Sequence, residues 1–143
     1  MSFTDELLKI CRHVGAFEKG AVCCGSVTVP QCLVLQELLE GARDMGSLSS
    51  HTGSTISAMT RLVDGLAARG FVERRRDADD GRRVLVALTK AGRAEGKSLR
   101  AATEAMVGAL LERIPKGKRR QVLDSMRIVR EAMDTMVSML GPS

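Results

Sequence analysis

The strongest constraint on the fold is a change in the spacing of apolar residues near position 70. Before this point, apolar residues recur every three or four positions, which predicts one buried face of a helix. These residues are Ile56, Met59, Leu62, Val63 and Leu66. Gly70 then gives a helix-ending signal, and residues 71–76 and 82–88 form two extended runs joined by DADDG. We therefore expect a helix followed by a β-hairpin with a polar tip.

Three further helices are predicted upstream of that helix. Residues 1–20 carry an apolar stripe at helical spacing, with charged residues between the apolar ones. A second helix is expected over residues 29–39, because Thr28 and Gln31 have the spacing of a capping box. Residues 46–53 are typical of a short polar helix that ends in a turn.

Two long amphipathic helices are predicted after the hairpin. The first begins at Thr89 and is ended by Pro115, and the last begins at about Lys118. Their stripes comprise Leu99, Ala102, Met106, Leu110 and Ile114, and then Val122, Met126, Val129, Met133, Val137 and Leu140. A small central lobe cannot cover both terminal pairs of helices. We therefore expect a second copy of the chain to bury part of their apolar surface.

Composition limits the class of protein. A chain of 143 residues with 44% hydrophobic residues can build one core without a metal, cofactor or disulfide. The absence of a membrane-length apolar run and of a leader pattern predicts a cytoplasmic protein that does not enter a membrane. In that compartment the four cysteines are not expected to form a disulfide framework. A net charge of +5 is compatible with a polyanionic partner.

The predicted order of short helix, turn, helix and basic hairpin is that of a winged helix-turn-helix, mainly α with a small β-hairpin wing. A helix that enters the DNA major groove, about 12 Å wide, needs small outward side chains and a few long hydrogen-bond donors. The second helix of the motif meets this requirement. Its candidate DNA contacts are Ser54, Thr55, Ser57, Ala58 and Arg61.

The hairpin concentrates positive charge beside that helix. Its arginines are Arg74, Arg75, Arg76, Arg82 and Arg83, of which the last four are candidate DNA contacts. Arginines in this position bind phosphates or enter a narrow minor groove. The acidic residues of the tip, Asp77, Asp79 and Asp80, are expected to pair with some arginines, and Asp80 is the candidate for orienting the wing.

Residues 60–93, TRLVDGLAARGFVERRRDADDGRRVLVALTKAGR, resemble the recognition helix, wing and following helix of the MarR family of bacterial transcription regulators. VTVPQCLVLQELLEG resembles the family's second helix, and Asp80-Gly81-Arg82 fits its wing motif. The likeness covers essentially the whole chain. Departures from the family's usual residues occur at Ala58, Gly65 and Gly81.

The resemblance implies a homodimer that binds double-stranded DNA at a pseudo-palindromic operator and represses genes until a ligand or oxidant changes the spacing of its lobes. We therefore predict one MarR-like domain over residues 1–143. Its winged-helix lobe is expected over about residues 28–90, with dimerisation helices over about residues 1–22 and 91–143. The expected function is sequence-specific regulation of transcription, without enzymatic activity.

The segment VCCGSVTVPQC, residues 22–32, is not explained by this fold alone. Cys11 lies on an apolar stripe and fits a small buried hydrophobe. Cys23 and Cys24 are neighbours in a non-helical break and cannot easily both enter one core, while Gly25 lets the chain turn back towards Cys32. Cys32 is expected in or just past the first turn of its helix, where the dipole favours a thiolate. These three thiols, Cys23, Cys24 and Cys32, are the candidate sensor.

Two chemistries compete for this sensor, beside a purely structural role. Three thiolates suit a thiophilic metal or metalloid such as arsenite, copper(I) or mercury. Alternatively, oxidation joins Cys32 to Cys23 or Cys24, or joins two subunits, in a reversible disulfide. The resemblance extends to family members with a CCG segment and a later cysteine, which favours thiol-based sensing.

Other interpretations stay open. His13 and His51 are possible nitrogen ligands for a metal, or ordinary surface or core residues. A thiol oxidoreductase is the alternative from a different class, and it would turn over a disulfide substrate. A winged-helix module that binds only proteins is a further alternative. The sequence shows no nucleophile paired with a base, no paired histidines and no phosphate-binding glycine loop. No other class of enzyme is therefore favoured.

Overall fold

The computed structural model describes residues 2–19 and 27–140. It divides into two compact units, Met1–Thr103 and Glu104–Ser143. The division into a winged-helix lobe and dimerisation helices that the sequence suggested stays a prediction. No helix within the described ranges is long and apolar enough to cross a membrane.

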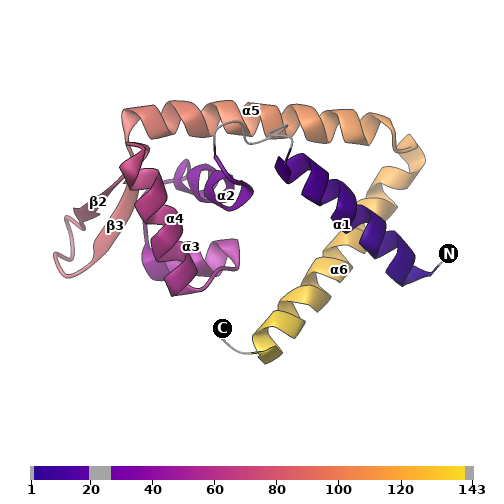
Figure 1. The fold of residues 1–143 in the computed structure, drawn as a ribbon, viewed down its shortest axis with the longest axis horizontal. Helices are drawn as coiled ribbons and strands as arrows, with labels where there is room; N and C mark the ends of the chain where they lie inside the picture. The colour runs from indigo at the N-terminus through magenta and orange to yellow at the C-terminus, as the bar shows by residue number, and fades with distance from the viewer. Residues whose placement is uncertain (1, 20–26, 141–143) are drawn as a thin grey trace. The chain divides into compact units, whose positions relative to one another are not determined.

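The described residues form helices and a small sheet (Figure 1). In chain order these are α1 (Phe3–Lys19), α2 (Val29–Leu38), β1 (Arg43–Asp44), α3 (Met45–Thr52), α4 (Ile56–Ala68), β2 (Val72–Arg76), β3 (Val84–Leu88), α5 (Lys90–Glu112), the 3-10 turn η1 (Lys116–Lys118) and α6 (Arg119–Leu140). The predicted fold class, mainly α with a hairpin wing, is confirmed. Every predicted helix and both hairpin strands are present within one or two residues of their expected limits.

Local signals set several of these boundaries. Thr28 Oγ1 accepts a hydrogen bond from the Gln31 backbone at 3.3 Å, and Gln31 Oε1 accepts one from the Thr28 backbone at 3.2 Å. The predicted capping box is therefore confirmed. Gly53 (φ 68°) ends α3 and Gly70 (φ 77°) follows α4, both in the left-handed region that favours glycine.

The sheet contains one strand that the sequence did not predict. Its order is β1-β3-β2, with all pairs antiparallel. β1 is only two residues long, and Arg43 pairs with Val86 while Asp44 pairs with Leu85. Because Asp44 also caps α3, this short strand fixes the start of the helix-turn-helix against the root of the wing.

The core of the first unit lies between α2, α3, α4 and the sheet. Its largest fully buried side chains are Leu35, Leu38, Leu48, Met59, Leu66, Val34, Val63 and Val86. Within the predicted stripe of α4, Met59, Val63 and Leu66 are therefore buried, as expected. The expectation for Ile56 is wrong, because its side chain is 56% exposed. Helical spacing gives the direction of a side chain, but at the first turn of α4 no element among the described residues covers that direction.

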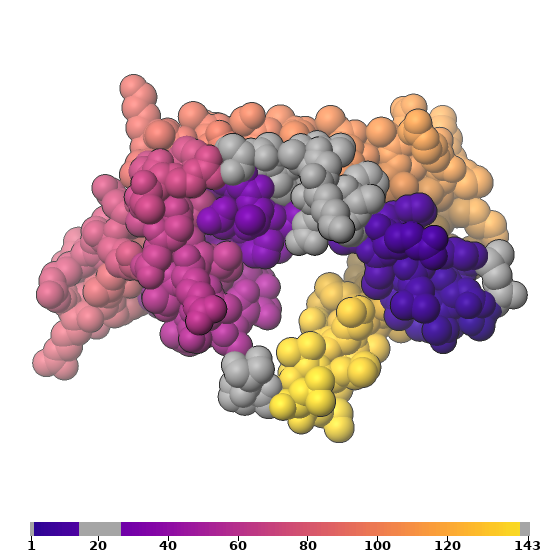
Figure 2. Space-filling model, viewed as in Figure 1, coloured from indigo at the N-terminus to yellow at the C-terminus, as the bar shows by residue number. Residues whose placement is uncertain are grey.

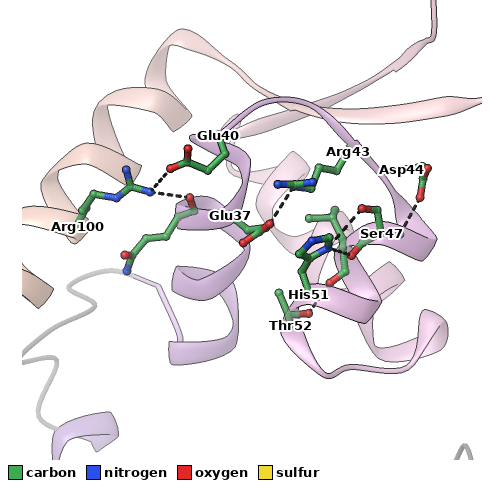
Figure 3. Close-up of polar contacts among 10 residues, drawn as sticks. Glu37, Glu40, Arg43, Asp44, Ser47, His51, Thr52 and Arg100 are labelled. Carbon is green, nitrogen blue, oxygen red and sulfur yellow. Dashed lines mark hydrogen bonds and ion pairs between the residues drawn. The ribbon is translucent and has the colours of Figure 1, made fainter. Parts of the chain in front are cut away.

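The first part of α5 is held close to this core. A Cβ at Gly92 would lie 1.8 Å from the Phe71 carbonyl oxygen, so only glycine permits this approach. Arg100 donates to the Gln36 carbonyl at 3.1 Å and to Glu40 Oε1 at 3.0 Å (Figure 3). These contacts satisfy an end carbonyl of α2 and fix α5 to it.

The second unit leaves its apolar stripe uncovered. No residue of α6 is buried. Its exposed large apolar side chains are Leu123, Met126, Ile128, Met133, Met136, Val137, Met139 and Leu140. Leu110 of the α5 stripe is also exposed, whereas Leu99, which lies in the first unit, is buried.

Candidate nucleic-acid interface

The outward face of α4 carries small side chains and one long cation. Ser57, Ala58 and Arg61 are exposed, and Ser54 is half-buried just before the helix. Thr55 is the N-cap, and its Oγ1 accepts a hydrogen bond from the Ala58 backbone at 3.1 Å. Ser54, Thr55, Ser57 and Ala58 therefore lie at the N-terminal end of α4, where backbone N–H groups favour a phosphate, and Arg61 lies in the following turn.

The wing projects from the first unit (Figure 2). Some of its arginines are engaged by other groups of the lobe and others are free. Arg74 forms an ion pair with Asp64 of α4 at 2.5 Å, and Arg76 donates to the Gly81 carbonyl at 2.8 Å. Arg75 and Arg82 are exposed, and neither guanidinium has a partner within the described residues. These two are the wing cations most accessible to DNA.

Two aspartates of the wing tip shape its turn. Asp77 Oδ1 accepts from the Asp79 backbone at 3.0 Å, and Asp80 Oδ1 accepts from the Arg82 backbone at 3.1 Å. The Arg83 backbone also donates to the Asp80 carbonyl at 3.0 Å. Asp80 thus acts on the backbone that presents Arg82, through a local side-chain turn.

Arg83 faces the lobe and is not free. Its guanidinium binds Asp44 of β1 and lies 3.5 Å from Asp77 Oδ2. Asp44 also accepts from the Ser47 backbone at 2.7 Å as the N-cap of α3 (Figure 3). The Ser47 N–H and then the Arg83 guanidinium lower the pKa of Asp44, and the Asp44 carboxylate raises the pKa of Arg83. One carboxylate therefore joins the wing root to the helix-turn-helix.

A second ion pair supports the same corner. Arg43 Nε lies 2.9 Å from Glu37 Oε1, at an angle outside the range of a hydrogen bond (Figure 3). This pair links β1 to α2 and is about three-quarters buried on both sides.

Sequence reasoning did not identify Asp44 and Asp64 as part of this site. The spacing of Asp44 and Ser47 is an N-cap signal that was available in the sequence. No local signal pairs Asp64 with Arg74, because they lie on different elements and meet only when β2 folds back beside α4.

The predicted thiol cluster is only partly within the described residues. Cys23 and Cys24 lie outside them. Cys32 is in the first turn of α2, as predicted, and is buried, with Gln36 Nε2 donating to its Sγ at 3.1 Å. Cys11 is exposed, so its interpretation as a buried hydrophobe is wrong for the single chain. An apolar edge gives only the direction of the thiol, and no described side chain covers it.

Neither histidine belongs to a group of potential metal ligands among the described residues. His13 is exposed on α1. His51 Nδ1 lies 2.7 Å from the Ser47 carbonyl (Figure 3), and because a carbonyl only accepts, this nitrogen carries the proton. Within residues 2–19 and 27–140, no group of three His, Cys, Asp or Glu side chains forms a metal cluster.

Comparisons with known proteins agree with this geometry. The model of the MarR family matches residues 26–83, which span α2 to the wing. An uncharacterized HTH-type transcriptional regulator from Mycobacterium bovis is 31% identical over 104 residues, which are 73% of this chain and 68% of the relative.

Solved structures share the same fold. A probable transcriptional regulator from Pseudomonas aeruginosa is 27% identical, with a TM-score of 0.72 over 86% of this chain and 93% of that one. FabT from Streptococcus pneumoniae, solved in complex with DNA, has a TM-score of 0.80 at 17% identity, over 93% of this chain and 96% of that one.

Proposed function

The chain belongs to the MarR family of DNA-binding transcriptional regulators, and from this premise we propose that it is a repressor that binds a pseudo-palindromic operator as a homodimer. The observation that carries the proposal is the exposed face of α4 beside the free wing cations. Ser57, Ala58 and Arg61 suit a major groove, and Arg75 and Arg82 suit the flanking backbone or minor groove.

The homodimer is supported by apolar surface that the single chain leaves exposed. On α1 these side chains are Phe3, Leu8, Ile10 and Val14, and on α6 they include Met126, Met133, Val137 and Leu140. Burying them against a second copy would also supply two recognition helices. Successive half-sites require those helices to be about 34–36 Å apart.

Replacement of single arginines tests DNA binding. Operator fragments are first selected with the purified protein from genomic DNA, and affinity is then measured at several salt concentrations. Arg61→Ala and Arg82→Ala should each weaken operator binding by about 1–3 kcal/mol. Arg127→Ala, a matched change on exposed α6, should leave it within error. If both interface variants bind as the wild type does, α4 and the wing do not contact DNA.

We propose further that a thiol-based signal releases the DNA, most simply a thiophilic metal or metalloid such as arsenite, copper(I) or mercury. This part rests on the sequence of residues 22–32 and on the position of Cys32 at the start of α2. A reversible disulfide, formed as peroxide takes up two electrons, is the alternative. A thiol oxidoreductase would instead turn over a disulfide substrate, and we infer no such catalysis.

The thiol proposal is tested on the protein bound to its operator. A Cys23→Ser, Cys24→Ser, Cys32→Ser variant should stay on DNA when arsenite, copper(I), mercury or peroxide is added, whereas the wild type dissociates. Because Cys32 is buried, the double variant at Cys23 and Cys24 provides a form that keeps this buried thiol. Dissociation of both variants by every agent would exclude thiol sensing.

A further inference from the structure

The densest positive charge of the chain lies outside the predicted DNA-binding lobe. Residues 113–120 contain no acidic residue and five basic ones, which we name the basic corner: Arg113, Lys116, Lys118, Arg119 and Arg120. The wing, residues 73–83, has five arginines but also four acidic residues. The corner surrounds η1, where α5 turns into α6 (Figure 1).

The charges of the basic corner are mostly uncompensated. Arg113 donates to the Ala109 carbonyl at 2.7 Å and Arg119 to the Ile114 carbonyl at 3.3 Å, both neutral acceptors. Lys118 donates to the amide oxygen of Gln121 at 3.3 Å. Of the five, only Arg120 reaches a carboxylate, that of Asp124, within the ranges that the structure describes, and its side chain is 83% exposed.

Helix stability explains only some of these residues, since Arg113 lies at the C-terminal end of α5 and donates to one of its carbonyls, where a cation is favourable. Arg119 and Arg120 open α6, and its first turn contains no acidic residue. The N-terminus of a helix carries partial positive charge, so arginines there are unfavourable and acidic side chains are favourable. Local rules are broken most often where function requires it.

We propose that the basic corner binds the phosphate backbone of duplex DNA as a second, sequence-independent contact, separate from α4 and the wing. The inference rests on the proposed function for the identity of the polyanion. Exposed lysines and arginines with no facing carboxylate attract phosphates and release their counterions. The phosphates come either from the duplex that flanks the operator or from a second duplex.

Salt dependence on random-sequence DNA tests this contact. Lys116→Gln with Lys118→Gln removes two corner charges and breaks no ion pair. Arg127→Gln with Arg130→Gln removes two charges from the same unit, where both arginines pair with aspartates of α6. The corner variant should flatten the slope of log affinity against log salt by about 1.8, at about 0.9 for each lost phosphate contact. The control should keep the wild-type slope.

Two further arms identify the source of the phosphates. If the corner variant loses affinity for an operator with long flanks but not for a minimal operator, the corner contacts the phosphates of the flanking DNA. If the immobilised operator complex of the wild type captures a second labelled duplex and that of the corner variant does not, the corner bridges two duplexes. Equal slopes for the corner variant and the control, or a preference of the corner for anionic vesicles over DNA, overturn the proposal.

The outcomes also separate this proposal from the proposed function. If operator binding is weakened by Arg61→Ala, and the corner variant binds DNA as the control does, only the corner proposal is overturned. If the protein selects no operator but its binding to random-sequence DNA needs the basic corner, the proposed function is overturned and the corner proposal is supported.

Discussion

At the scale of single residues, Asp44 performs two tasks with one carboxylate. It caps α3 through the Ser47 backbone, and it holds Arg83 at the root of the wing. Asp44→Ala should therefore lower the free energy of unfolding by about 1 kcal/mol, the usual cost of a lost N-cap. Asp44→Asn keeps a good cap and loses only an exposed ion pair, so its cost should be smaller. Urea unfolding of both variants at neutral pH measures the difference.

The pH dependence of the same pair follows from the lowered pKa of Asp44. A carboxyl whose pKa is lower in the folded protein stabilises the fold above its unfolded value, here 3.8, and loses that contribution as pH falls through the folded value. The wild type should therefore be more stable than Asp44→Asn at neutral pH, and the gap should shrink below about pH 3.8. A gap that stays constant down to pH 2 would show that the charge of Asp44 contributes nothing.

At the scale of elements, two glycines of α5 give opposite predictions for one substitution. Gly92→Ala places a Cβ 1.8 Å from the Phe71 carbonyl oxygen, so α5 must move away from the lobe, and a loss of about 1–3 kcal/mol is expected. Gly108→Ala meets nothing within 4 Å and should raise stability by about 0.5–1 kcal/mol through helix propensity. Thermal unfolding compares the two. Similar shifts in melting temperature for both variants would contradict the close approach at Gly92.

The elements themselves are largely predictable from the sequence. Strong periodicity and capping residues such as Thr28 place the helices, and the change to alternating residues places the hairpin. β1 is not predictable, because two residues have no period and the strand exists only through its pairing with Val86 and Leu85. The burial of Ile56 is mispredicted for a related reason, since the pattern of one helix does not reveal which neighbours cover it.

The candidate interface follows the same division. The small outward face of α4 and the concentration of wing arginines are visible in the sequence. Which arginines are free is not, because that depends on distant partners: Asp64 engages Arg74 and Asp44 engages Arg83. Among the arginines of α4 and the wing, the most accessible are therefore Arg61, Arg75 and Arg82. Their roles in DNA binding stay predictions.

At the scale of the whole molecule, the proposed dimer through the exposed stripe of α6 predicts that DNA affinity depends on assembly. In the proposed complex each winged-helix lobe contacts one half-site, and joining two lobes would make the second contact intramolecular, which raises the overall affinity. Met133→Glu places a charge in the apolar stripe, where its burial against a second copy is costly. The proposed dimer should then dissociate, and operator binding should weaken although every residue of α4 and the wing is unchanged.

Thr135→Glu is the matched control, because it adds the same charge to α6 on the side opposite Met133. Sedimentation equilibrium should give a dimer for the wild type and for Thr135→Glu, and a monomer for Met133→Glu at the same concentration. Binding to a single half-site should be equal in all three proteins, since that contact needs one lobe only. If Met133→Glu is monomeric but keeps full affinity for the two-site operator, the two half-sites are read independently and no dimer sets their spacing.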